Sequence, residues 1–153
     1  KRFDFAVANP PFSLKNWTDG LKDYGRFDGY GDRPPEKNGD FAWLLHILKS
    51  LKSTGKAAVI LPHGVLFRGN AEATIRKAII DKGYIKGIIG LPANLFYGTG
   101  IPACIIIIDK ADAAERKGIV TLKHRAKICE EFLVFLCHRC NPAIFGTMGF
   151  DFF

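Results

Sequence analysis

Residues 3–12, Phe3-Asp4-Phe5-Ala6-Val7-Ala8-Asn9-Pro10-Pro11-Phe12, contain the feature that decides the fold. The first six are aromatic-rich and apolar apart from one aspartate, a pattern typical of a short buried strand. Two prolines end that strand, because proline cannot donate to a sheet ladder and fixes its own φ. The sequence therefore predicts a rigid corner at the carboxyl end of a strand, the edge at which open α/β sheets bind ligands.

This corner suits the chemistry of an exocyclic amine, a poor nucleophile because its lone pair is delocalised into a π system. The side-chain oxygen of Asn9 and the backbone carbonyl of Pro10 are two acceptors for the N–H groups of such an amine. They would stabilise the charge that develops as the amine attacks. Phe12 would stack on the planar group. The tetrapeptide alone is equally compatible with a strand that runs into a simple turn, with Phe12 in the core.

Downstream of the corner, the pattern alternates between helices and strands. Apolar residues recur at helical spacing after Asp40, the predicted N-cap, and Gly55 is the predicted stop; Asn70 is the predicted cap of a second helix. The expected helices are residues 40–52 and 71–82, and the expected buried strands are residues 56–61, 84–91 and 103–108. The connection between the last two strands is too short for a parallel crossover, so they should form an antiparallel pair.

Two longer motifs follow the predicted strands: Leu-Pro-His-Gly-Val-Leu-Phe-Arg-Gly at residues 61–69 and Ile-Gly-Leu-Pro-Ala-Asn-Leu-Phe-Tyr-Gly-Thr-Gly-Ile-Pro at residues 89–102. Asn9-Pro10-Pro11-Phe12 resembles the catalytic motif of S-adenosylmethionine-dependent amino-group methyltransferases. With the two longer motifs, the chain resembles the modification (M) subunit of type I restriction–modification systems, an adenine-N6 DNA methyltransferase family. The resemblance runs from about residue 3 to residue 110.

The resemblance implies an α/β fold, the C-terminal half of a Rossmann-like methyltransferase sheet that ends in an antiparallel hairpin. Residues 1–110 would be that half of the catalytic domain, and residues 111–153 a tail that does not match the family. In the family, a glycine-rich turn and an acidic residue that hold S-adenosylmethionine precede the corner. Of the residues in this chain, only Asn9 would touch the cofactor, and only at its edge.

The resemblance also implies roles and partners. Asn9 and Pro10 would accept hydrogen bonds from the adenine amine, Pro11 would stiffen the corner, and Phe12 would stack on a base flipped out of the duplex. Double-stranded DNA, a specificity (S) subunit and a restriction (R) subunit would be the partners. The alternatives are methylation of RNA or of protein glutamine through the same corner, or a catalytically incompetent fragment.

Residues 13–39 form a long connection that contains five glycines and interleaves aromatic with basic residues. A long loop in a compact domain is often functional, and this one suits a flap that closes over a substrate. The alternative is a loop whose aromatic residues pack locally. The candidate DNA-binding residues, four in this loop and one in residues 61–69, are Lys15, Trp17, Arg26, Arg33 and Arg68.

The net charge of +7 favours a polyanionic partner, although the basic residues are not concentrated in one block. No apolar run is long enough for a membrane span, and no signal peptide opens the chain, so we expect a cytoplasmic protein. Cys137 and Cys140 have the spacing of half a zinc site, but further ligands at regular spacing are missing. The sequence therefore predicts no metal and reduced thiols.

The sequence changes character after Lys110. A polar helix over residues 111–117, a strand over 119–122 and an amphipathic helix over 126–138 are expected, and residues 137–153 have no clear periodicity. A shifted reading frame and a divergent terminal extension both explain the change.

We predict that this 153-residue chain alone binds no S-adenosylmethionine measurable by calorimetry. The few contacts available from Asn9 must offset at least several kcal/mol of lost translational and rotational freedom. Micromolar binding to a monodisperse monomer would contradict the prediction.

Overall fold

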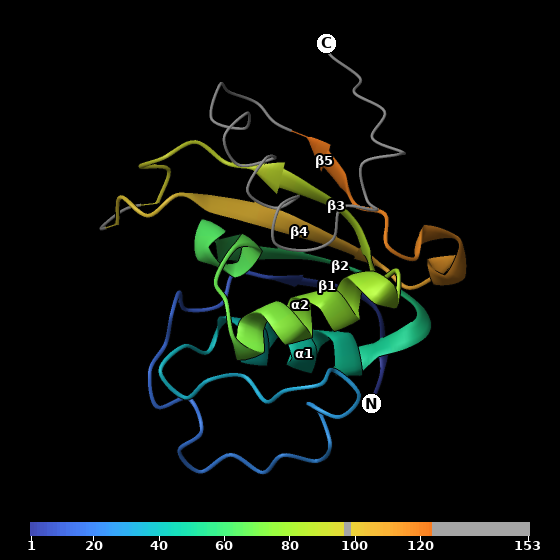
Figure 1. Cartoon of the computed structure of the whole chain (residues 1–153), viewed down its shortest axis with the longest axis horizontal. Coiled ribbons are helices and arrows are strands. Elements are labelled where there is room, and N and C mark those ends of the chain that lie inside the picture. The colour runs from blue at the N-terminus through green and yellow to red at the C-terminus, as the bar shows by residue number, and fades with distance from the viewer. Residues whose placement is uncertain (97–98, 124–153) are drawn as a thin grey trace.

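The structure is a computed structural model that describes residues 1–96 and 99–123. In these ranges a sheet of five strands carries two α-helices (Figure 1). The elements in chain order are β1 (Phe3–Ala8), α1 (Asp40–Ser50), β2 (Leu51–Pro62), the 3-10 helix η1 (His63–Leu66), α2 (Ala71–Asp81), β3 (Ile85–Gly90), β4 (Ala103–Asp109), the 3-10 helix η2 (Ala113–Arg116) and β5 (Thr121–Lys123).

The strand order is β1-β2-β4-β3-β5. β1 and β2 are parallel, as are β3 and β5, whereas β4 lies antiparallel between β2 and β3. The predicted α/β fold and the predicted antiparallel pair of β3 and β4 are therefore confirmed. Because β4 reverses direction between two parallel neighbours, the carboxyl ends of β1, β2 and β3 lie at one edge of the sheet.

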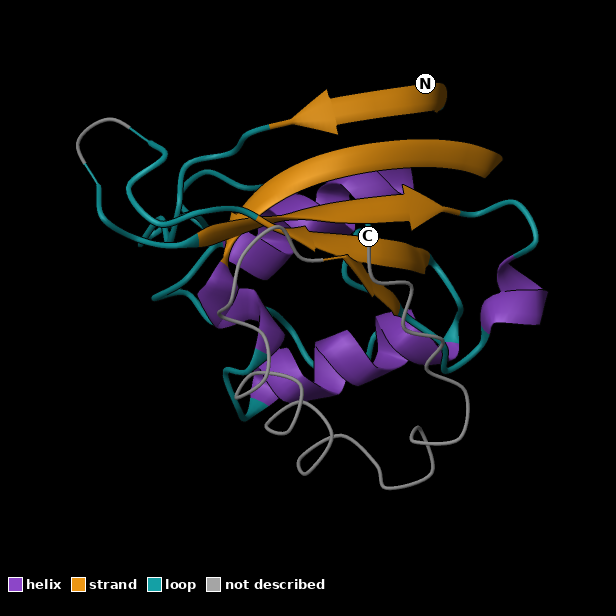
Figure 2. Ribbon diagram, turned by 90° about the horizontal axis from the view of Figure 1, so that it is seen from above, coloured by secondary structure: helices purple, strands orange, loops and turns teal. Residues whose placement is uncertain are grey.

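Both α-helices cover the same face of the sheet (Figures 1 and 2). Val59 of β2, Ile106 of β4 and Ile88 of β3 are neighbours in register on that face, and each is at least 92% buried. Alternate residues on the strands point to the opposite face, as the pleat requires. The apolar stripes of the two helices complete the core with Phe41, Leu44, Leu45, Leu48, Ile75 and Ile79.

The first helix ends earlier than the sequence predicts, at Ser50 rather than Lys52. Its C-cap residue, Leu51, is already extended and begins β2, so Gly55 lies inside a strand instead of stopping a helix. A Cβ at Gly55 would lie 3.0 Å from the carbonyl oxygen of Phe3, so the glycine permits close approach of β1. Asp40 is the first helical residue rather than the cap, a position occupied by Gly39.

The prediction that β1 is buried was wrong. Phe3, Phe5 and Val7 are 46%, 75% and 88% exposed, whereas Ala6 and Ala8, on the other face, pack against the core. β1 is one of the two edge strands of the described sheet, so it has a neighbour on one side only. Its sequence therefore has the composition of an inner strand, while its position leaves one apolar face uncovered.

Residues after Lys110 contribute to the sheet through β5, which pairs with β3. β5 overlaps the strand that the sequence predicts over residues 119–122. The expected polar helix is only the single 3-10 turn η2. The expected helix over residues 126–138 and three of the four cysteines lie outside the described residues. Cys104 is free and fully buried, and burial raises the pKa of its thiol to about 12.

No helix among the described residues is long and apolar enough to cross a membrane.

We predict that the chain self-associates through the exposed edge of β1 and that Val7→Lys reduces this self-association, measured by sedimentation velocity. A charge on an exposed edge strand opposes edge-to-edge pairing, and Val7 is so exposed that the free energy of unfolding should change by no more than about 0.5 kcal/mol. Ile119→Lys is the matched control, because Ile119 is an exposed apolar residue outside β1. An equal effect of the two substitutions would show that the edge of β1 is not responsible.

Candidate functional site

Three connecting segments meet at the carboxyl edge of the sheet. Residues 9–12 follow β1, residues 63–70 follow β2, and residues 91–96 and 99–102 lie between β3 and β4. The backbone N–H of His63 donates to the carbonyl of Pro102 at 2.9 Å, which links the second segment to the third. The described parts of the two longer motifs therefore lie side by side at this edge.

The corner itself is accessible. Asn9 and Pro11 are exposed, while Pro10 and Phe12 are half-buried. The ring of Phe12 meets the ring of Phe96 edge to face, with centroids 5.6 Å apart and an interplanar angle of 82°. Phe12 therefore packs against the loop after β3 and is outside the core cluster, at the surface where the three segments converge.

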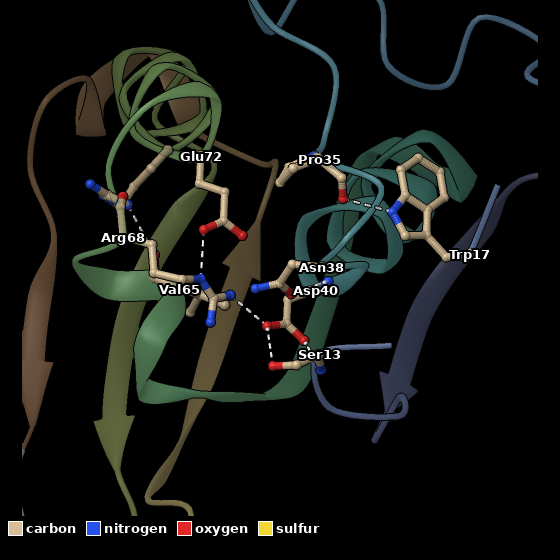
Figure 3. Close-up of polar contacts among 9 residues, drawn as sticks. Ser13, Trp17, Pro35, Asn38, Asp40, Val65, Arg68 and Glu72 are labelled. Atoms are coloured by element: carbon tan, nitrogen blue, oxygen red, sulfur yellow. Dashed lines mark hydrogen bonds and ion pairs between the residues drawn. The ribbon is translucent and has the colours of Figure 1, made fainter. Parts of the chain in front are cut away.

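Immediately after the corner, Ser13 is tied to the start of α1 (Figure 3). Its backbone N–H donates to Oδ1 of Asp40 at 2.7 Å, and its hydroxyl donates to Oδ2 at 3.3 Å. Ser13 has a φ of 50°, in the left-handed region. That conformation costs a non-glycine residue about 1–2 kcal/mol, so it requires bonds of this kind to hold it.

Asp40 is completely buried, and Arg68 neutralises it. Arg68 Nη2 lies 2.5 Å from Asp40 Oδ2, and Arg68 Nε lies 2.5 Å from Glu72 Oε2 (Figure 3). Arg76 in turn donates to the carbonyl oxygens of Val65 and Arg68, at 3.2 and 2.9 Å. The network thus joins the corner, the loop after β2 and both helices.

The electrostatics of the network follow from burial and pairing. Burial raises the pKa of the Glu72 carboxyl, and the hydrogen bond from Arg68 opposes that rise. Burial alone would lower the pKa of the Arg68 guanidinium, but its bonds to Glu72 and Asp40 outweigh this and raise it. Arg68 therefore stays charged between two carboxylates.

The long connection is closed at its base. Gly39 N–H donates to the carbonyl of Leu14 at 2.9 Å, and Asn16 N–H donates to that of Glu36 at 3.1 Å. The indole N–H of Trp17 donates to the carbonyl of Pro35 at 2.9 Å. The two ends of the connection at residues 13–39 thus run side by side, which favours the alternative that its aromatic residues pack locally. The role of the connection as a flap over a substrate stays a prediction.

The candidate DNA-binding residues lie in different settings. Lys15 is exposed, and Trp17 packs edge to face on Phe27, which is buried. Arg26 donates to the carbonyls of Asp23 and Lys22, at 2.9 and 3.0 Å. Arg33 lies over the Phe27 ring at 5.4 Å and 3.7 Å from Asp23. Of the five candidates, the polar contacts join only Arg68 to the corner, through Asp40 and Ser13.

The sequence analysis missed Ser13, Asp40 and Glu72. Asp40 stands at the start of an apolar helix, where an acidic residue is the sequence signal of a helix cap. Its bonds nevertheless reach residues 27 and 28 positions away. Arg68 and Glu72 have opposite charges and are four residues apart. That spacing could have predicted their ion pair from the sequence.

Among residues 1–96 and 99–123, no group of three or more histidine, cysteine, aspartate or glutamate side chains is placed to hold a metal ion. The Cys137–Cys140 pair lies outside these ranges. Asn9 is the residue from which we expect contact with a cofactor, and it is exposed.

Comparison with known proteins gives consistent matches. The family model for N-6 DNA Methylase matches residues 1–131, past the predicted limit at Lys110; the division of the chain at that point stays a prediction. The methylase subunit of the type I restriction enzyme HindI of Haemophilus influenzae is 41% identical over 122 residues, covering 78% of this chain and 27% of that protein.

Two solved structures are also similar. The methyltransferase subunit of a type I restriction–modification system from Streptococcus thermophilus is 41% identical, with a TM-score of 0.68 over 82% of this chain and 28% of that chain. A putative class I S-adenosylmethionine-dependent methyltransferase from Listeria monocytogenes, 19% identical, shares the fold with a TM-score of 0.61 over 87% of this chain and 40% of that one. The chain spans less than a third of each type I relative.

We predict that Phe12→Ala lowers the free energy of unfolding of the chain by only about 1 kcal/mol, the value of one aromatic contact. Phe41→Ala, in the core, should lower it by about 3–5 kcal/mol. Urea unfolding followed by circular dichroism measures both. Equal losses would mean that Phe12 is a core residue rather than part of an accessible site.

Proposed function

The chain belongs to the N-6 DNA Methylase family, and on that premise we propose that it is a segment of an M subunit of a type I restriction–modification system. The proposed reaction transfers a methyl group from S-adenosylmethionine to N6 of adenine in DNA. The observation that carries the proposal is the accessible Asn9-Pro10-Pro11-Phe12 corner, at the sheet edge where the two longer motifs of the chain also lie.

The corner would act on the amine as it becomes a nucleophile. Oδ1 of Asn9 and the carbonyl oxygen of Pro10 would accept hydrogen bonds from the two N–H groups of adenine N6. These bonds strengthen as positive charge develops on nitrogen, so they stabilise the transition state more than the ground state. Pro11 limits the freedom of the backbone, which keeps the acceptors preorganised.

The adenine must leave the duplex to reach the corner, since its amine is otherwise paired. Phe12 would stack on the flipped base, and its edge-to-face contact with Phe96 supports this proposal because that contact occupies at most one face of the Phe12 ring. Base stacking on an aromatic side chain is worth roughly 1–3 kcal/mol and fixes the plane of the base.

S-adenosylmethionine would supply the methyl group, and Asn9 would touch only its edge. The type I relatives are more than three times as long as the matched part of this chain, so the remaining cofactor contacts would come from sequence outside it. In the described part of the chain β1 is an edge strand, and further strands of a longer protein would pair with it there.

Double-stranded DNA, an S subunit and an R subunit are the proposed partners, and the cytoplasm is the proposed location. The positive charge of the chain and the exposed Lys15 support contact with DNA phosphates, with Arg26 and Arg33 as further candidates. The relatives favour DNA over RNA or protein glutamine as the substrate class.

We predict that Asn9→Ala in the full-length methylase subunit lowers kcat about a hundredfold or more, because one preorganised hydrogen bond to the developing charge is lost. Asn9 is exposed, so DNA binding and the unfolding temperature should change little. Asn9→Asp retains an acceptor oxygen and should be less damaging. Methylation of plasmid DNA with radiolabelled cofactor measures kcat, and near-normal turnover by Asn9→Ala would contradict the proposed role.

A further inference from the structure

We propose that Asp40 and Arg68 are positioning residues that hold the Asn9–Phe12 corner in its reactive geometry. This inference rests on the proposed function. Neither residue belongs to the Asn-Pro-Pro-Phe motif. Both act on it through Ser13, the residue that follows Phe12 in the chain (Figure 3).

The corner is held at both ends. On one side Ala8 pairs with Val59 in the β1–β2 ladder. On the other side the N–H of Ser13 donates to the buried carboxylate of Asp40 at 2.7 Å. Only residues 9–12 lie between these two anchors, and two of the four are prolines whose φ is fixed. The Asp40 bond therefore decides where the acceptors of Asn9 and Pro10 lie.

The bond to Asp40 also selects an unusual backbone conformation. Ser13 adopts a positive φ, which a serine holds only when its surroundings favour it. Both its N–H and its hydroxyl bind the same carboxylate. Without that carboxylate, Ser13 would relax toward negative φ and would turn the chain that leaves Phe12.

Arg68 fixes the direction of the Asp40 carboxylate. Its planar guanidinium bridges Asp40 on α1 and Glu72 on α2, at 2.5 Å to each. A buried carboxylate needs a charged partner, and the rigid guanidinium gives that partner a defined orientation. The position of the corner is thus set by both helices.

A contact between Arg68 and a DNA phosphate is the competing role. The side chain of Arg68 is 26% exposed, and its Nε and Nη2 groups already bind carboxylates. If the Arg68 guanidinium moved to a phosphate, the Asp40 and Glu72 carboxylates, which are at least 95% buried, would lose their charged partner. Leaving two buried charges unpaired is unfavourable. We therefore assign Arg68 to the interior network.

The test uses the full-length methylase subunit and separates kcat from KM. Asp40→Ala should lower kcat about 30- to 100-fold, since a displacement of about 1 Å at a reacting centre costs up to a hundredfold. KM for DNA and for S-adenosylmethionine should stay within about threefold, because the substrate contacts remain. Asp40→Asn keeps an acceptor for Ser13 and should lose less activity than Asp40→Ala, which also keeps the test usable if the alanine variant misfolds.

Arg68 gives a second pair of variants. Arg68→Met should lower kcat about as much as Asp40→Ala. Arg68→Lys should recover part of the lost activity, because an ammonium group can bind a carboxylate but lacks the planar guanidinium geometry that bridges Asp40 and Glu72. Asp81→Asn on the exposed face of α2 is the control for a carboxylate change and should retain full activity. Ile79→Ala, in the core, is the control for lost stability alone.

The proposal would be overturned if folded Asp40→Ala and Asp40→Asn both kept kcat within about threefold of wild type. It would also fail if Ile79→Ala, with the same unfolding temperature as Asp40→Ala, lost as much kcat as that variant. A rise in KM for DNA with unchanged kcat in Arg68→Met would likewise overturn it. The thresholds follow from the size of the expected displacement effect. If Asn9→Ala abolishes activity while the Asp40 variants do not, only the positioning role fails.

Hydrogen exchange followed by mass spectrometry supplies a readout that needs no catalysis. Peptides that contain the Ser13 amide should exchange slowly in wild type and faster in Asp40→Ala and Arg68→Met, with Asp81→Asn unchanged. Fast exchange in wild type would show that the bond to Asp40 does not hold. Slow exchange in a subunit that methylates no adenine would instead contradict the proposed function.

Discussion

The hydrogen bond from the Ser13 amide to the buried Asp40 carboxylate is the interaction on which the site depends. It joins the segment that carries the proposed catalytic motif to the helix that crosses from β1 to β2. Arg68 extends the same connection to the loop after β2 and to α2. A tetrapeptide at the end of an exposed edge strand would otherwise have few restraints, since among the strands that the structure describes only β2 pairs with β1. We propose that the polar network gives the corner the rigidity that preorganised catalysis requires.

Much of the fold was predictable because it follows from local patterns. Apolar runs ended by proline or glycine marked the strands, helical spacing marked α1 and α2, and a short connection required that β3 and β4 be antiparallel. The errors arose where tertiary position overrides local composition. β1 reads as an inner strand but lies at an edge, and Gly55 reads as a helix stop but serves the close approach of Phe3.

The candidate site was predictable to a smaller extent. Asn9–Phe12 stood out because two prolines end a predicted strand and because the tetrapeptide resembles a methyltransferase motif. Arg68 follows another predicted strand, so it was expected near the same edge of the sheet. The partner of Arg68 could not be inferred, because the bond to Asp40 spans 28 residues and an acidic residue before a helix has a simpler interpretation as a cap. Interactions of this kind depend on how two crossover connections pack, which no local pattern encodes.

A structure of the full-length subunit with a cofactor analogue and DNA containing the target adenine tests the central claim most directly. We expect adenine N6 to lie about 3 Å from both Asn9 Oδ1 and the carbonyl oxygen of Pro10, with the Ser13–Asp40 bond intact. An adenine bound away from these two acceptors, or a corner that reaches it only after the Ser13–Asp40 bond has broken, would contradict the claim.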